Sequence, residues 1–170
     1  MRRLLLLRHA KSSWNDETLD DHLRPLDERG ERAAAIIGAY LAQSRIRVDR
    51  VLCSTALRAT QTVERVGRLV ELPEPTLEPS LYLATGQALL ERLRRLPEAA
   101  EGVLLVGHNP GIADLAENIA GRGATDDLDR MVRKFPTAGL AVLHIGPAGW
   151  SGLRPGSASL EHFVTPKRLV

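Results

Sequence analysis

Histidine and arginine side chains occur together in three short segments of this 170-residue chain. Arg8 and His9 are adjacent, Arg58 lies further along, and His108 follows a glycine. A neutral imidazole can act as a base, a ligand or a nucleophile, and a guanidinium matches the oxygens of a phosphate group in a bidentate fork. If folding brings these four side chains together, they predict a site for a phosphoryl group.

Each of the three segments follows a short, mainly apolar run that is typical of a strand buried on both faces. The runs are residues 4–7, which are four leucines, residues 50–53 and residues 103–106. The carboxyl ends of parallel strands meet at one edge of a sheet, where open α/β sheets bind ligands. The second and third runs lead into predicted helices, whose free N–H groups favour anions. The sequence therefore predicts one shared site at that edge.

Four amphipathic helices are predicted from apolar residues at helical spacing. The first has Asp27 as its N-cap, and the second is capped by Ser54 or Thr55. The third includes residues 89–96, and the fourth begins near residue 112. These helices alternate with the predicted strands along the chain.

Further strands are predicted at residues 140–145 and near residues 160–164, whereas residues 121–137 carry mixed signals. Strands that alternate with helices indicate a mainly parallel sheet covered on both faces. The expected fold class is therefore α/β, with three α/β/α layers. A chain of this length, 44% apolar, is expected to form a single domain over residues 1–170.

The composition excludes several classes of function. The net charge is only +2 and no basic stretch is interleaved with aromatic residues, so no nucleic-acid partner is expected. No apolar stretch is long enough to cross a bilayer, so no membrane partner is expected either. The single cysteine, Cys53, excludes an internal disulfide and suits a reducing compartment, which favours a cytoplasmic location. The sequence gives no indication of an oligomeric state.

Neither a cofactor nor a metal ion is expected. The chain lacks the glycine-rich run of a nucleotide-binding P-loop, and no group of His, Cys or Asp has metal-ligand spacing. The acidic run at residues 126–129 favours a solvated turn over a metal site. Cys53 and Arg58 bracket a loop as in cysteine phosphatases, but those enzymes have one more intervening residue than the four found here. We therefore expect Cys53 to be a buried structural residue.

Taken in order, the three segments resemble the motifs of a known family. Leu-Leu-Arg-His-Ala at 6–10, Ser-Thr-Ala-Leu-Arg-Ala-Thr-Gln-Thr at 54–62 and Val-Gly-His-Asn-Pro at 106–110 are similar to motifs of the histidine phosphatase superfamily. That resemblance implies a phosphoglycerate mutase-like fold. The short chain, with Leu-Arg-Pro-Leu at 23–26 and Pro-Thr-Ala at 136–138, is most similar to the compact SixA branch of phosphohistidine phosphatases.

The resemblance implies that His9 is a nucleophile that becomes phosphorylated, while Arg8, Arg58 and His108 hold the phosphoryl oxygens. Water then releases phosphate, and no metal is needed because the arginines supply positive charge. The implied partner is a phosphorylated substrate such as a phosphohistidine-bearing signalling protein. Three alternatives stay open: a phosphomonoesterase acting on small molecules, a mutase, and a non-catalytic phosphate-binding module. Little chain is available for a mutase lid after His9 or around residues 72–86.

Two departures from the family pattern concern the reaction. Ala10 stands where many members have glycine, and we expect it to be tolerated. Asn109 stands where some members place an acid that protonates the leaving group. The candidates for a replacement are Glu78 and Asp21, each of which could instead be a loop carboxylate paired with an arginine. Solvent is the third candidate, because an imidazole leaving group needs only weak acid catalysis.

Residues that follow the Arg-His pair are expected to line the entrance through which a phosphate group reaches the site. Ser12 and Trp14 are expected to line it, and Arg24 is expected to bind the substrate. Trp14 could stack on a substrate ring or cover the edge of the core. Little chain is left to roof the pocket, so an open site is predicted.

Overall fold

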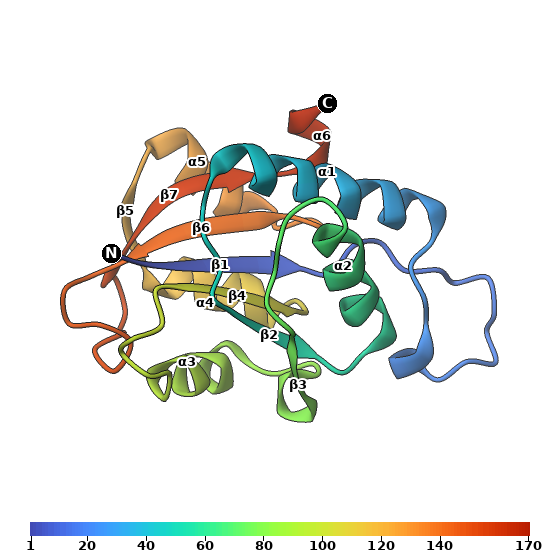
Figure 1. Ribbon diagram of the computed structural model, residues 1–170, viewed down its shortest axis with the longest axis horizontal. Helices are drawn as coiled ribbons and strands as arrows, with labels where there is room; N and C mark the ends of the chain where they lie inside the picture. Colours follow the sequence, from blue (N-terminus) through green and yellow to red (C-terminus); the bar gives the residue numbers. More distant parts are fainter.

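A seven-stranded mixed sheet forms the centre of the computed structural model, which describes residues 1–170 (Figure 1). The strands are β1 (Arg2–Arg8), β2 (Arg50–Ser54), β3 (Thr76–Glu78), β4 (Gly102–Gly107), β5 (Ala120–Gly123), β6 (Leu140–Ile145) and β7 (Ala158–Val164). Their order in the sheet is β3-β2-β4-β1-β6-β7-β5. Only β6 runs antiparallel to its neighbours β1 and β7, and the other four pairs are parallel. The predicted mainly parallel sheet is therefore confirmed.

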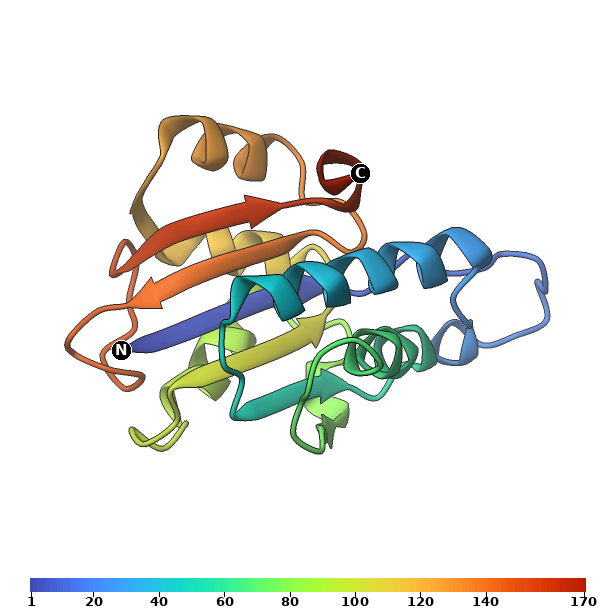
Figure 2. The ribbon, with the colours of Figure 1, turned by 45° about the horizontal axis from the view of Figure 1, so that its top comes forward.

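Helices cover both faces of this sheet. They are α1 (Glu28–Ser44), α2 (Leu57–Gly67), α3 (Gly86–Arg94), α4 (Gly111–Ile119), α5 (Thr125–Arg133) and the short α6 (Pro166–Leu169), with 3₁₀ turns η1 (Asp21–Leu23) and η2 (Pro79–Leu81). The apolar sides of α1 and α2 belong to one core, and those of α3, α4 and α5 belong to a second core across the sheet. Figure 2 shows the helical layers on either side of the strands. The three-layer prediction is confirmed.

Strand β1 lies in the middle of the sheet. It lies between β4 and β6, and its four leucines are 0% exposed. Leu4 and Leu6 pack into one core, while Leu5 and Leu7 pack into the other. Full burial of a leucine side chain is worth about 1.5–3 kcal/mol, so both faces of the strand hold it in place. The Arg-His pair is thus attached to a rigid support.

The predicted helix starts are only partly confirmed. Asp27 is the N-cap of α1, and its Oδ1 accepts a hydrogen bond of 2.7 Å from the Gly30 N–H. The prediction for α2 is wrong, because Ala56 is the N-cap. The Ser54 hydroxyl instead accepts from the Ala56 N–H within the preceding turn, at 3.2 Å.

The mixed region at residues 121–137 contains two elements that the sequence patterns did not identify. Strand β5 is short and rich in glycine, and it pairs with β7 through an irregular register. Helix α5 has a single buried residue, Met131, so its apolar face is narrow. Its acidic run lies in the first turns, where the helix dipole favours negative charge. No cluster of side chains suited to a metal ion is present.

No helix is both long enough and apolar enough to cross a lipid bilayer.

Candidate active site

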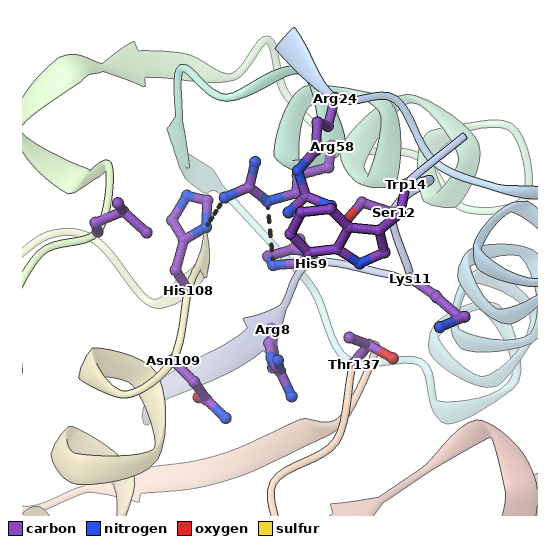
Figure 3. A pocket seen from close by; sticks show the side chains of 11 residues that line it. Arg8, His9, Lys11, Ser12, Trp14, Arg24, Arg58, His108, Asn109 and Thr137 are labelled. Atoms are coloured by element: carbon purple, nitrogen blue, oxygen red, sulfur yellow. Dashed lines mark hydrogen bonds between the residues drawn. The ribbon is translucent and has the colours of Figure 1, made fainter. Parts of the chain in front are cut away.

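A pocket of about 330 Å³ lies at the carboxyl ends of β1 and β4 and beside the start of α2 (Figure 3). It is lined by Arg8, His9, Lys11, Ser12, Trp14, Arg24, Arg58, Leu83, His108, Asn109 and Thr137. The structure therefore brings seven of the nine predicted site residues together. The other two are Asp21, which touches the pocket through the arginines, and Glu78, which lies outside it.

His9 continues the line of β1 and presents one ring nitrogen to the pocket. Its backbone N–H donates to the Gly107 carbonyl at 3.0 Å, which extends the pairing with β4. Its Nδ1 lies 2.7 Å from the Ala10 carbonyl oxygen. Because a carbonyl can only accept, Nδ1 carries the ring proton and Nε2 keeps its lone pair. The Nε2 atom is therefore the one that can attack a phosphorus atom.

Both pocket histidines are neutral at physiological pH. Burial lowers the pKa of His9 from 6.5 to about 4, and the charge of Arg58 adds to this effect. Burial likewise lowers the pKa of His108 from 6.5 to about 3, together with the nearby His9 and Arg58. A histidine is uncharged above its pKa, so His9 is a competent nucleophile without help from a base.

Arg58 lies in the first turn of α2 and is only 3% exposed. Its guanidinium stands between the two imidazoles (Figure 3). Its Nε is 3.4 Å from His9 Nε2, and one terminal nitrogen is 3.4 Å from His108 Nδ1. The same guanidinium donates to the backbone carbonyl of Asp21 at 2.6 Å and to its carboxylate at 2.9 Å. Asp21 thus binds both terminal nitrogens of Arg58, while Nε faces His9 and the terminal nitrogen on the carboxylate also faces His108.

His108 is oriented by a residue that sequence reasoning assigned to a helix cap. Its Nε2 lies 2.7 Å from the hydroxyl of Ser54, at the fully buried end of β2. When Arg58 donates to Nδ1, Nε2 must carry the proton and donate to Ser54. If the Ser54 hydroxyl donated instead, the proton on Nδ1 would face the Arg58 guanidinium, which can only donate, so the arrangement of the contacts favours a proton on Nε2.

Arg8 ends β1 with an unmet hydrogen-bond donor. One terminal nitrogen donates to the Phe135 carbonyl at 3.1 Å, but the buried Nε has no partner. Burial and the charge of Arg58 both lower the pKa of Arg8 from its ordinary value. A buried donor without a partner costs free energy, and this Nε is the only buried side-chain nitrogen or oxygen that the protein leaves without one.

The outer wall of the pocket is a stacked pair. The Arg24 guanidinium donates to the Ser12 hydroxyl at 2.8 Å, and its carbon lies 3.5 Å from the centre of the Trp14 ring. Trp14 remains 71% exposed, so it does not cover the core edge, which was one of its two predicted roles. Stacking of Trp14 on a substrate ring remains a prediction.

Asp21 has no proton to donate at neutral pH. Burial alone would raise its pKa, but hydrogen bonds from Tyr82 and Arg58 hold the pKa well below the usual range of a carboxyl. Its Oδ1 also accepts from Arg24 at 3.1 Å. Asp21 thus contacts two arginines of the pocket, and these contacts favour a positioning role over that of a proton donor.

Glu78 lies outside the pocket and is paired with an arginine that does not line it. Its two carboxylate oxygens accept from Arg92 of α3 at 2.7 and 2.9 Å. Glu78 thus has the contacts of the second role considered for it, a loop carboxylate paired with an arginine. Asn109 also donates no acid proton to the pocket, since its amide donates to the Phe135 carbonyl at 2.9 Å and accepts from the first turn of α4. The lining of the pocket contains no carboxylic acid.

Cys53 is buried, as predicted, and burial raises the pKa of its thiol to about 12. A thiol nucleophile needs the opposite shift. This excludes the cysteine phosphatase alternative on chemical grounds.

Comparison with known proteins gives a consistent result. The family model of the histidine phosphatase superfamily (branch 1) matches residues 4–82. An uncharacterized protein of Mycobacterium tuberculosis is 39% identical over 163 residues, covering 95% of this chain and 100% of that protein. The phosphohistidine phosphatase SixA of Escherichia coli is 28% identical over 152 residues, covering 86% of this chain and 88% of that protein.

Solved structures show the same likeness. A protein from Agrobacterium tumefaciens assigned as phosphohistidine phosphatase SixA is 32% identical, with a TM-score of 0.82. The match covers 97% of this chain and 98% of that one. A SixA structure complexed with tungstate shares the fold at a TM-score of 0.81 and 22% identity, over 99% of both chains.

Proposed function

Since this chain belongs to the histidine phosphatase superfamily, and is therefore a metal-independent phosphatase, we propose that it hydrolyses phosphohistidine through a phosphoryl group carried on His9. The observation that carries the proposal is the unprotonated Nε2 of a neutral His9, which lies against the guanidinium of Arg58. The proposed partner is a protein that carries phosphohistidine, of the kind used in signalling.

In the first step, the lone pair of His9 Nε2 attacks phosphorus and the bond to the leaving group breaks. Charge spreads over the three equatorial oxygens, where the cations can stabilise it. The unmet Nε donor of Arg8 and the inner nitrogens of Arg58 are the groups placed to do so. His108 adds a third donor once Arg58 turns its terminal nitrogen from Nδ1 to the phosphoryl oxygens, so that Nδ1 carries the ring proton and the Ser54 hydroxyl donates to Nε2.

In the second step, water attacks the phosphorus, the P–N bond to His9 breaks, and phosphate leaves. The electron pair returns to Nε2, which restores the neutral ring.

The leaving group of the first step needs a proton. No protonated carboxyl lines the pocket, so this proton comes from solvent. A free imidazole has a pKa of about 6.5, which makes it a far better leaving group than an alkoxide. This chemistry favours phosphohistidine over alkyl phosphates.

The test is a comparison of kcat/KM for a phosphohistidine peptide and for small alkyl phosphate esters. Positioned acid catalysis contributes about 10²–10⁴-fold, so we expect the phosphohistidine peptide to be favoured by about 100-fold or more. Equal values for the two substrates would overturn the proposal in favour of a general phosphomonoesterase. The double variant Asp21→Asn/Glu78→Gln gives a second check, because loss of all turnover of phosphohistidine would exclude solvent as the proton donor.

A further inference from the structure

A second, larger groove of about 1250 Å³ lies next to the pocket. Its walls come from α1, from the last turn of α5 and from α6, and Figure 2 shows the C-terminal α6 beside α1. Half of its sixteen lining residues are Lys or Arg, and none is Asp or Glu. The groove therefore collects positive charge that the sequence distributes over distant segments.

Six of these basic side chains are exposed and form what we call the cationic groove: Arg29, Arg32, Arg133, Lys134, Lys167 and Arg168. None of the six takes part in an ion pair. Among the basic residues of the lining, only Arg130 has an acidic partner, Asp127, at 2.7 Å. Like charges held together without counterions create a positive potential that attracts anions.

The cationic groove is continuous with the pocket. Lys11 and Thr137 line both cavities, so they form the border between them. A chain segment whose phosphoryl group reaches His9 can therefore extend over this border into the groove. The position of the groove links it to the same substrate that the pocket takes.

The lining of the groove favours a protein over a nucleic acid. Single-stranded nucleic acids bind to grooves in which exposed aromatic rings stack on the bases. Phe163 is the only aromatic residue of this groove, and it is 2% exposed. The remaining surface includes Ile36 and Pro166, which suit the aliphatic parts of Asp and Glu side chains.

We propose that the cationic groove docks acidic side chains of the protein whose phosphohistidine enters the pocket. This rests on the proposed function and adds the charge class of the partner. The groove acts on recognition, not on the chemical step, since none of its six residues lines the pocket. It should raise kcat/KM for acidic substrates and leave the reaction of small substrates unchanged.

The test uses two phosphohistidine peptides of equal length, one flanked by Asp and Glu and the other by Asn and Gln. At low ionic strength the acidic peptide should have a kcat/KM about ten-fold higher, and the difference should disappear as salt screens the charges. Equal values for the two peptides at low ionic strength would overturn the proposal.

The double variant Arg29→Glu/Arg133→Glu reverses charge on two walls of the groove. It should lose the preference for the acidic peptide while kcat/KM for the neutral peptide stays within about two-fold. The matched control is Arg47→Glu/Arg50→Glu, which makes the same change of charge at exposed residues near the amino end of β2. A preference that survives in the groove variant, or is lost equally in the control, would contradict the docking role.

Binding of the same two peptides without phosphate separates this proposal from the proposed function. Fluorescence anisotropy should show tighter binding of the acidic peptide to the wild type than to the groove variant, whether or not the protein hydrolyses phosphohistidine. A short single-stranded RNA serves as a competitor. Displacement by RNA with no difference between the peptides would mean that the groove binds nucleic acid, which overturns the proposal.

Discussion

Two arginine–carboxylate pairs lie on neighbouring parts of the molecule and have different consequences. Arg58 and Asp21 are joined at 2.9 Å, and Arg92 and Glu78 are joined at 2.7 Å. In the first pair, Asp21 accepts from both terminal nitrogens of the guanidinium, while Nε faces His9 and one of those terminal nitrogens also faces His108. In the second pair, the carboxylate takes both Nε and a terminal nitrogen, and neither residue lines the pocket.

We propose that the position of the arginine, and not the pairing itself, decides whether its carboxylate partner supports the reaction. Arg58 follows β2 directly and is brought to the shared edge of the sheet. Arg92 lies in the last turns of α3, which packs on one face of the sheet. The following predictions test this distinction, beginning with the largest effect.

Arg58→Ala should mainly lower activity, whereas Arg92→Ala should mainly lower stability. Arg58→Ala should lower kcat/KM for phosphohistidine by about 10²–10³-fold, because it removes charge stabilisation from the transition state. Arg92→Ala should leave kcat/KM within about two-fold and lower the free energy of unfolding by about 1–2 kcal/mol through loss of a partly buried ion pair. Phosphate release and urea unfolding measure the two quantities. Equal losses of activity in the two variants would contradict the distinction.

Neutralising the two carboxylates should again affect activity only for the pair at the pocket, but by a smaller factor. Asp21→Asn should lower kcat by about ten-fold, because Arg58 loses the partner that orients it, as is common for residues that support a catalytic group. Glu78→Gln is the matched control and should leave kcat within about two-fold. A loss of activity in Glu78→Gln as large as in Asp21→Asn would show that Glu78 acts in the reaction after all.

The smallest effect is on the ionisation of the histidines, which NMR titration of the ring nitrogens can follow. His9 of the wild type should titrate near its pKa of about 4, well below the ordinary 6.5. Arg58→Ala should raise that pKa but leave it below 6.5, because burial is the larger cause. Asp21→Asn should lower the pKa of His108 further, since the Asp21 charge raises it. Glu78→Gln should change neither value, and a shift in that variant would contradict the account.

The same pKa values predict how folding stability depends on pH. The folded-state pKa of His9 lies below the unfolded value, so the unfolded chain binds protons first as the pH falls. The contribution of the neutral ring to stability is complete above about 6.5 and is lost as the pH falls towards about 4. The free energy of unfolding, measured with urea at several pH values, should therefore fall more steeply with decreasing pH in the wild type than in His9→Ala between pH 6.5 and pH 4. Identical pH dependence would show that His9 is not buried in its neutral form.

Sequence patterns predicted the fold and placed Arg8, His9, Arg58 and His108 in one site, because both predictions depend on the local order of residues along the chain. The apolar runs place a strand end before each Arg or His, and parallel strand ends meet at one edge. The partners of Asp21 and Glu78 could not be predicted in this way. Asp21 and Tyr82, for example, are 61 residues apart and meet only through tertiary packing.

The cationic groove could not be predicted for a related reason. Its basic residues lie on three helices and at Lys134, just after α5, and each of these segments alone is typical of a solvated surface. The packing of α6 against α1 brings two of these surfaces together, as Figure 2 shows. Helix α5 was itself missed because it is short and mostly polar, with Met131 as its one buried residue.

The central claim is that His9 carries the phosphoryl group, and a trapping experiment tests it most directly. The protein is incubated briefly with a radiolabelled phosphohistidine peptide, quenched in alkali, and digested for mass spectrometry. We expect an acid-labile label on His9 of the wild type and none in His9→Ala, while Cys53→Ala is labelled normally. Turnover without a protein-bound label, or a label on any residue other than His9, would contradict the account.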